Sequence, residues 1–219
     1  MRPKKTILLT GFEPFGGEAI NPSWEAVRAL DGKIMSDGSV IAVARLPCVF
    51  GDSLDVLAQH VCKHKARIVV CVGQAGGRSE LSIERVAINV DDARIPDNAG
   101  AQPIDTAIRA DGPAAYFSTL PIKAIVAALQ AKEIPAAVSQ TAGTFVCNHV
   151  FYGLMHLAAQ TPKIKRAGFV HIPFLPEQAI RHPNTPSMSL EVMVAGLEQI
   201  IESTLTVKTD LGATGGSTH

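Results

Sequence analysis

The chain has 219 residues, 47% of them hydrophobic and 18% charged, and its 20 Lys plus Arg are balanced by 20 Asp plus Glu. This composition is typical of one folded globular domain and excludes a disordered chain. The balanced charge argues against a protein that binds nucleic acid or an anionic membrane through its overall field.

Short runs of β-branched and leucine residues predict strands, and the periodic segments between them predict helices. In chain order, strands are expected at 5–10, 40–46, 66–72, 82–90, 135–139 and 167–172. Helices are expected at 22–30, 51–64, 121–132, 145–159 and 188–205, the first with Asn21 as N-cap and Pro22 at its first position. This alternation predicts an α/β fold: a single three-layer domain whose twisted, mostly parallel or mixed central sheet carries helices on both faces.

Two segments fall outside this alternation. Residues 91–121 contain several prolines and glycines, and we expect an ordered surface excursion with a functional role. The glycine-rich tail 210–219 is expected to be disordered, which leaves 1–209 as the folded domain.

The location is expected to be cytoplasmic. The basic start is followed by an apolar run, 7–9, that is too short for a signal peptide, and no run approaches the roughly 20 apolar residues that span a bilayer. The four cysteines, Cys48, Cys62, Cys71 and Cys147, form no C-x-x-C pair. We therefore expect reduced thiols rather than disulfides or a structural zinc site.

Cys147 is the candidate nucleophile. The run 137–148 predicts a strand that breaks at Gly143 and restarts as a helix, so Cys147 falls in the first helical turn. Unpaired N–H groups and the helix dipole at that position are expected to lower the thiol pKa, and the same N–H groups could hold an oxyanion. The alternative is a small buried hydrophobic residue, which is the interpretation we adopt for the other three cysteines.

His171 is the candidate base. It lies near the end of a buried strand, and sites in open α/β sheets gather beyond the carboxyl ends of strands, an edge that Cys147 could also reach. A core histidine bonded to backbone is the alternative. His149 is a poor base for Cys147, because two residues of one helix that lie two positions apart point to different sides. His149 and His156 are about 10 Å apart along the helix, too far for a simple metal chelate.

Glu84 is the candidate third member. In a strand over 82–90 it would share the apolar face of Val86 and Ile88, and a buried carboxylate needs a polar partner. An imidazole N–H would satisfy it, and so would an internal ion pair with Arg78 or Arg94.

Two glycine-rich loops, 11–17 and 73–78, do not fit nucleotide-binding motifs. The first lacks the Lys-Ser/Thr ending of a P-loop and carries Glu13, which would repel phosphate. Its Phe12 and Phe15 suit a small, flat, neutral ligand, although such rings more commonly cap the core.

The chain resembles the pyroglutamyl peptidase type I family nearly end to end. The resemblance is carried by T-G-F-E-P-F-G-G at 10–17, G-G-R at 76–78, L-S-I-E-R-V-A-I-N at 81–89, D-A-R-I-P-D-N at 92–98, S-Q-T-A-G-T-F-V-C-N at 139–148 and V-H-I-P-F at 170–174. It implies a single α/β domain, a homotetramer, and the catalytic roles of Glu84, Cys147 and His171. It further implies that the lactam pocket is lined by Phe12, Phe15, Gln74, Ile95, Phe145 and Val146.

The expected reaction is hydrolysis of the amide bond that follows an N-terminal pyroglutamyl residue of a peptide, without metal or other cofactor. Cys147 attacks, His171 transfers the proton, Glu84 orients the imidazole, and Arg94 aids the helix N–H groups at the oxyanion. An apolar pocket accepts the uncharged lactam and penalises a free ammonium group. The alternatives are a nucleoside phosphorylase-like enzyme and a non-catalytic protein that binds a small ligand.

Overall fold

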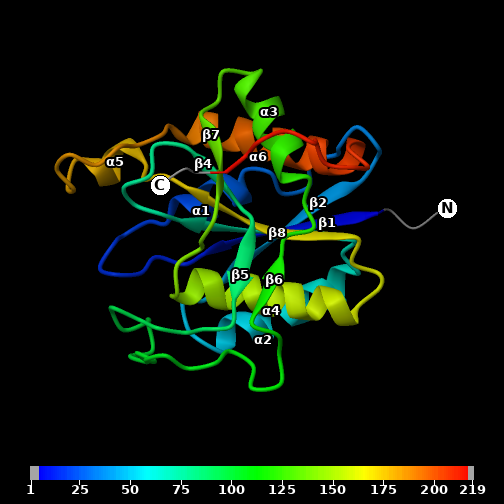
Figure 1. The fold of residues 1–219 in the computed structure, drawn as a ribbon. Coiled ribbons are helices and arrows are strands. Elements are labelled where there is room, and N and C mark those ends of the chain that lie inside the picture. Colours follow the sequence, from blue (N-terminus) through cyan, green and yellow to red (C-terminus); the bar gives the residue numbers. More distant parts are fainter. Residues whose placement is uncertain (1–4, 217–219) are drawn as a thin grey trace.

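The computed structural model describes residues 5–216, which build one sheet between two layers of helices (Figure 1). The strands are β1 (Thr6–Phe12), β2 (Val40–Leu46), β3 (Ile68–Gln74), β4 (Leu81–Glu84), β7 (Ala136–Ser139) and β8 (Arg166–Ile172). They lie in the order β2-β1-β3-β8-β4-β7. Strands β1 to β3 and β8 are parallel, whereas β4 and β7, parallel to each other, run antiparallel to β8. The predicted mixed α/β fold is confirmed.

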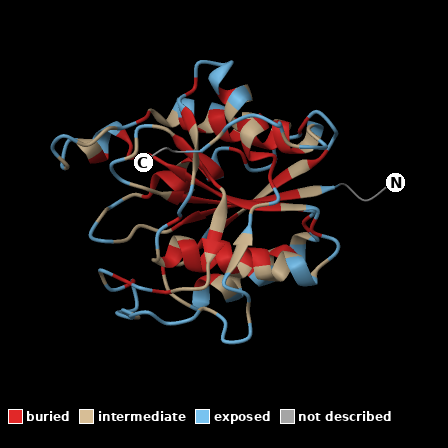
Figure 2. Cartoon of the chain, in the orientation of Figure 1, coloured by how far each residue is buried: buried red, intermediate tan, exposed pale blue. Residues whose placement is uncertain are grey.

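The five long helices divide between the two faces of the sheet, and the buried residues gather along the strands and the inner helix faces (Figure 2). One face is covered by α1 (Pro22–Arg28), α3 (Ile122–Gln130) and α6 (Leu190–Thr206), and the other by α2 (Asp52–His64) and α4 (Val146–Gln160). Strand β3 serves both cores, because Val70 faces the first layer and Val69 and Cys71 face the second.

The ends of the five long helices agree closely with the bounds predicted from the sequence. Helix α1 begins as expected, with Pro22 at its first position and the Asn21 side chain accepting the Ser23 N–H at 3.0 Å. A short helix, α5 (Pro176–Ala179), was not predicted. No helix within 5–216 is both long and apolar enough to traverse a bilayer.

The strand expected over 82–90 is wrong beyond Glu84. The chain leaves the central sheet at Arg85 and forms β5 (Val86–Ile88), which pairs with an unpredicted strand, β6 (Ala115–Phe117), inside the excursion. Ala87 is fully buried, whereas Val86 and Ile88 are half-buried, so the expected apolar face is reversed there.

Asn148 explains why the strand breaks where it does. Its buried side chain accepts the Ile88 N–H at 3.0 Å and donates to the carbonyls of Ile88 and Val90 at 2.9 Å. The neighbouring strand β7 ends at Ser139, opposite Glu84, and its last contact is the Ser139 carbonyl, which accepts the Arg85 N–H at 2.9 Å. A side chain from α4 therefore takes over the backbone groups that the central sheet cannot pair.

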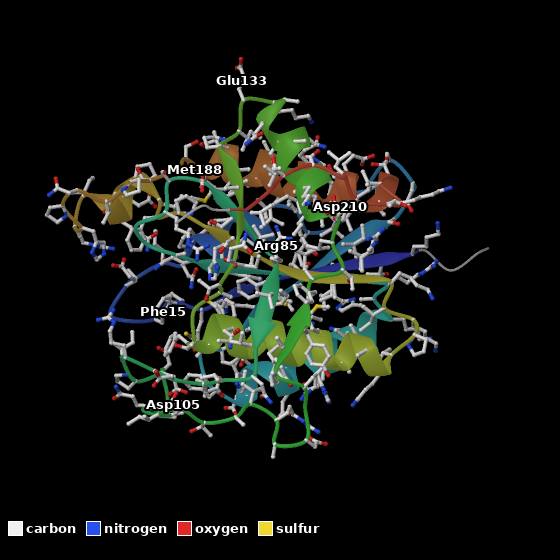
Figure 3. All side chains as sticks on the ribbon, viewed as in Figure 1. Phe15, Arg85, Asp105, Glu133, Met188 and Asp210 are labelled. Atoms are coloured by element: carbon white, nitrogen blue, oxygen red, sulfur yellow. The ribbon has the colours of Figure 1, made fainter. Side chains whose placement is uncertain are left out.

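The excursion and the tail are both tied to the body of the domain. In the excursion, which contains Asp105 (Figure 3), the Asp97 carboxylate accepts N–H groups from Ala99, Ala101 and Phe50 at 2.8–2.9 Å. In the tail, Asp210 accepts the Lys123 and Ala124 N–H groups at the start of α3. The expected disorder of the tail 210–219 stays a prediction, and residues 217–219 lie outside the described chain.

Candidate active site

His171 and Glu84 form a buried hydrogen-bonded pair on the sheet face that α2 and α4 cover. The imidazole Nδ1 lies 2.7 Å from Glu84 Oε1, and the two side chains are 4% and 0% exposed. His171 is the cross-strand partner of Ser82, two residues before Glu84. Because an ionised carboxylate can only accept, Nδ1 carries the proton and Nε2 keeps its lone pair. His171 can therefore act as a base through Nε2.

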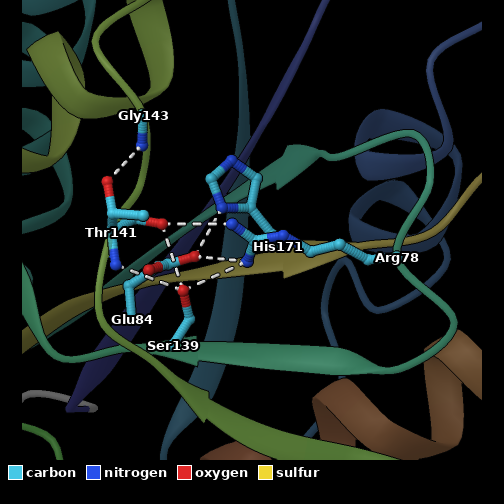
Figure 4. Close-up of polar contacts among 6 residues, drawn as sticks. All are labelled: Arg78, Glu84, Ser139, Thr141, Gly143 and His171. Atoms are coloured by element: carbon cyan, nitrogen blue, oxygen red, sulfur yellow. Dashed lines mark hydrogen bonds and ion pairs between the residues drawn. The ribbon is translucent and has the colours of Figure 1, made fainter. Parts of the chain in front are cut away.

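Glu84 also forms an ion pair. Arg78 Nη1 lies 2.7 Å from the same Oε1 atom (Figure 4). Both partners that the sequence left open are thus present together, an imidazole and an arginine. The arginine is Arg78, while Arg94 is exposed and has no ion pair among the described residues.

Cys147 lies beside this pair. It is the second residue of α4, as the strand-break pattern predicted. A Cβ built on Gly73 would stand only 2.8 Å from Cys147 Sγ, so the sulfur rests against the sheet at that glycine. Gly73 is the cross-strand neighbour of His171 in the parallel β3–β8 pair, and paired residues project to the same face. Thiol and imidazole therefore share one small area of the sheet.

The sequence analysis expected Cys147 and His171 to meet because both follow carboxyl ends of strands at one edge of the sheet. This explanation holds for His171 but not for Cys147. His171 and Gly73 do lie near the carboxyl ends of parallel strands. Strand β7, which leads toward Cys147, runs the opposite way, so its end is not on that edge. The loop 140–145 instead brings the chain over Gly73.

Burial governs the proton affinities of Cys147 and His171. Desolvation raises the pKa of the Cys147 thiol above its usual 9.0, and Cys48 and Glu84 raise it further, although Arg78 opposes them. The expected lowering is therefore wrong: a helix terminus contributes about 0.3–1 kcal/mol, and desolvation of the half-buried thiol outweighs it. Desolvation lowers the pKa of His171 below its usual 6.5, against the hydrogen bond and charge of Glu84. At neutral pH the free protein therefore holds a thiol and a neutral imidazole.

Three phenylalanine rings gather beside the start of α4. The ring centroids of Phe15 and Phe145 are 6.0 Å apart, and Phe50 meets Phe145 edge-on at 5.5 Å. Phe15, labelled in Figure 3, lies on the loop after β1 and is half-buried. Phe50 was missed, although it follows the end of β2 much as Phe15 follows the end of β1.

The other four pocket candidates differ in accessibility. Phe12 is 2% exposed and packs 6.4 Å from the Phe169 ring, and Val146 is fully buried, so both belong to the core. Gln74 ends β3 and its Oε1 accepts from Gln178 Nε2 at 3.0 Å. Ile95 is half-buried in the excursion.

His149 has its own partners, a feature that the sequence did not predict. Its Nδ1 lies 2.8 Å from Asp91 Oδ2, and its Nε2 accepts the Gly51 N–H at 3.0 Å. The ring also meets Phe50 edge-on at 5.3 Å. His149 therefore joins the excursion to the loop that carries Phe50, and it is engaged away from Cys147.

The remaining cysteines behave differently from one another. Cys48 and Cys71 are buried, as expected, and burial raises the pKa of each to about 12. Cys62 is exposed, so the packing interpretation is wrong for it.

Within residues 5–216, no group of three or more His, Cys, Asp or Glu side chains has an arrangement that could hold a metal ion.

Comparisons of the sequence and the structure with known proteins all find peptidases of one family. A family model described as pyroglutamyl peptidase matches residues 5–207. A pyrrolidone-carboxylate peptidase of Cupriavidus pinatubonensis is 64% identical over 98% of this chain and 100% of the relative. Pyroglutamyl peptidase I from Bacillus amyloliquefaciens has a similar structure, with TM-score 0.93, 48% identity and coverage of 97% and 100%. The Pyrococcus furiosus pyrrolidone carboxyl peptidase follows with TM-score 0.89, 43% identity and coverage of 91% and 98%. The phosphorylase and ligand-binding alternatives are not favoured.

Proposed function

Because the chain belongs to the pyroglutamyl peptidase family, we propose that Cys147, His171 and Glu84 carry out its reaction. The chain is a cysteine-type hydrolase that removes an N-terminal pyroglutamyl residue. The observation that carries the assignment is the contact of Cys147 Sγ with Gly73, the strand neighbour of His171, whose imidazole bonds to Glu84.

The reaction begins with proton transfer, because the resting thiol is protonated. His171 Nε2 takes the Cys147 proton as the sulfur attacks the carbonyl carbon of the pyroglutamyl residue. The imidazolium formed is stabilised by Glu84, and its proton then passes to the departing amine. A water molecule, deprotonated by His171, cleaves the thioester and releases pyroglutamate.

The tetrahedral oxyanion would be held by the N–H groups of the first turn of α4, since that turn has no side-chain cap. Arg94 is the second candidate for this role, and its exposed position leaves its side chain free to turn toward a bound substrate.

The lactam pocket would be formed around the rings of Phe15 and Phe145, with Phe12 and Val146 as its buried base and Gln74 and Ile95 at its margin. Two aromatic faces suit the flat, uncharged lactam, while a free α-ammonium group would lose its hydration there without a counter-charge. This difference would restrict the enzyme to blocked N-termini.

The partners would be peptides with an N-terminal pyroglutamate, in the cytoplasm, with neither nucleic acid nor membrane involved. Domain 1–209 would act as a homo-oligomer, a tetramer by family resemblance. Light scattering coupled to gel filtration tests the assembly, and a monomer at micromolar concentration would refute it.

The direct test is fluorophore release from pyroglutamyl-aminomethylcoumarin by the wild type and by Cys147→Ser. A less acidic and less nucleophilic hydroxyl should lower kcat by on the order of 10³-fold or more. The exposed Cys62→Ser is the matched control and should retain wild-type kcat. Equal activity of Cys147→Ser and the wild type would refute the nucleophile.

A further inference from the structure

Arg78 spans the space between the Glu84 carboxylate and the loop that leads to Cys147. Its Nη1 donates to Glu84 Oε1 at 2.7 Å and to Ser139 Oγ at 3.3 Å, and its Nη2 donates to the Thr141 carbonyl at 3.1 Å. The Thr141 hydroxyl in turn accepts the Gly143 N–H at 3.0 Å (Figure 4). One guanidinium therefore contacts the carboxylate and both ends of the Ser139–Thr141 turn.

The Glu84 carboxylate depends on few partners. Arg78 and His171 both bond to Oε1, and Oε2 is buried without a hydrogen-bond partner among residues 5–216. Loss of Arg78 would leave one hydrogen bond to orient a fully buried carboxylate. A planar guanidinium can serve the carboxylate and the loop carbonyl at once, which a single ammonium group cannot do with the same geometry.

Two opposite charges act on His171. Glu84 faces the imidazole from β4, the Phe169 ring centroid lies 4.9 Å from that of the imidazole, and Arg78 is the cation bonded to the same Glu84 oxygen. The Cys147 thiol lies on the same sheet face at Gly73, the strand neighbour of His171. The Arg78 charge lowers the pKa of His171, opposing Glu84, and also lowers the pKa of the Cys147 thiol. Without that cation, the carboxylate would hold a proton on the imidazole more strongly.

We infer that Arg78 is a positioning residue of this peptidase: it fixes the Glu84 carboxylate against His171 and ties that pair to the loop before Cys147. The inference rests on the proposed roles of Glu84, His171 and Cys147. Arg78 acts through these residues and has no contact with substrate in this role.

The test compares the pH profiles of kcat/KM for the wild type, Arg78→Met and Arg78→Lys. Loss of a charge-assisted hydrogen bond should lower kcat of Arg78→Met by roughly 10- to 100-fold. The acid limb of its profile should move to higher pH, because the imidazole then keeps its proton longer. Arg78→Lys retains the charge and should keep the wild-type acid limb, with a kcat between the other two.

Arg67→Met is the matched control, because Arg67 is exposed just before β3, at the opposite end of that strand from Gly73. It should leave both kcat and the pH profile unchanged. An Arg78→Met acid limb at the wild-type position would overturn the inference, and so would a wild-type kcat for Arg78→Lys, which reports even if Arg78→Met does not fold. Absence of product from the wild type would instead refute the proposed function.

Discussion

Gly73→Ala should slow the enzyme by displacing the nucleophile. The added Cβ would stand 2.8 Å from Cys147 Sγ and 2.8 Å from the Cζ atom of Phe169. Ordinary contact begins at 3.4 Å, so the sulfur must retreat by about 0.6 Å unless the aromatic ring and the strand move as well. The backbone of Gly73 is not in the left-handed region, so alanine itself introduces no dihedral strain.

The expected magnitude follows from the geometry of attack. A displacement of about 1 Å at reacting atoms can cost about 10²-fold in rate, so kcat of Gly73→Ala should fall by roughly 10- to 100-fold. Overpacking of this kind also destabilises a core by about 1–3 kcal/mol. The KM for pyroglutamyl-aminomethylcoumarin should change little, because the phenylalanine rings of the proposed pocket lie on other segments.

Gly153→Ala is the control that separates displacement of the Cys147 sulfur from a general loss of folding stability. Its Cβ would clash with Leu54 Cδ2 in the same core layer, but Gly153 lies six residues beyond Cys147 on α4, nearly two helical turns away. Urea unfolding should register a loss of stability in both variants, whereas kcat should fall only in Gly73→Ala. A Gly73→Ala enzyme with wild-type kcat would refute the packing of the thiol against this glycine.

Two further predictions concern proton binding and loop position. Burial raises the pKa of Cys71 from 9.0 to about 12, so the thiol stabilises the fold fully below pH 9 and loses that contribution as pH rises toward 12. At pH 10 the loss is about 1 kcal/mol. Between pH 8 and pH 10, Cys71→Ala should therefore lose less stability against urea than the wild type by about that amount, and identical losses would contradict this account. His149→Ala removes the acceptor for the Gly51 N–H and the partner of Asp91, so KM should rise roughly 5- to 10-fold with kcat nearly retained. Steady-state kinetics measures both constants. An unchanged KM would contradict the role of His149 in joining the 91–121 excursion to the loop that carries Phe50.

The fold was largely predictable because its signals are local. Asn21 and Pro22 mark a helix start through their own side chains, and the periodicity of 190–206 belongs to that segment alone. The strand break at Arg85 was not predictable in this way. It depends on where β7 ends and on the side chain of Asn148, which lies 60 residues beyond Ile88 in the chain.

The candidate site likewise has features that follow from local sequence and features that depend on long-range contacts. The sequence by itself determined that Cys147 begins a helix, that His171 ends a strand and that Glu84 is buried, and its motifs determined the family. Only the tertiary structure decided that one carboxylate oxygen serves both His171 and Arg78. The direction of the thiol pKa likewise depends on desolvation by residues distant in sequence, which outweighs the local effect of the helix terminus.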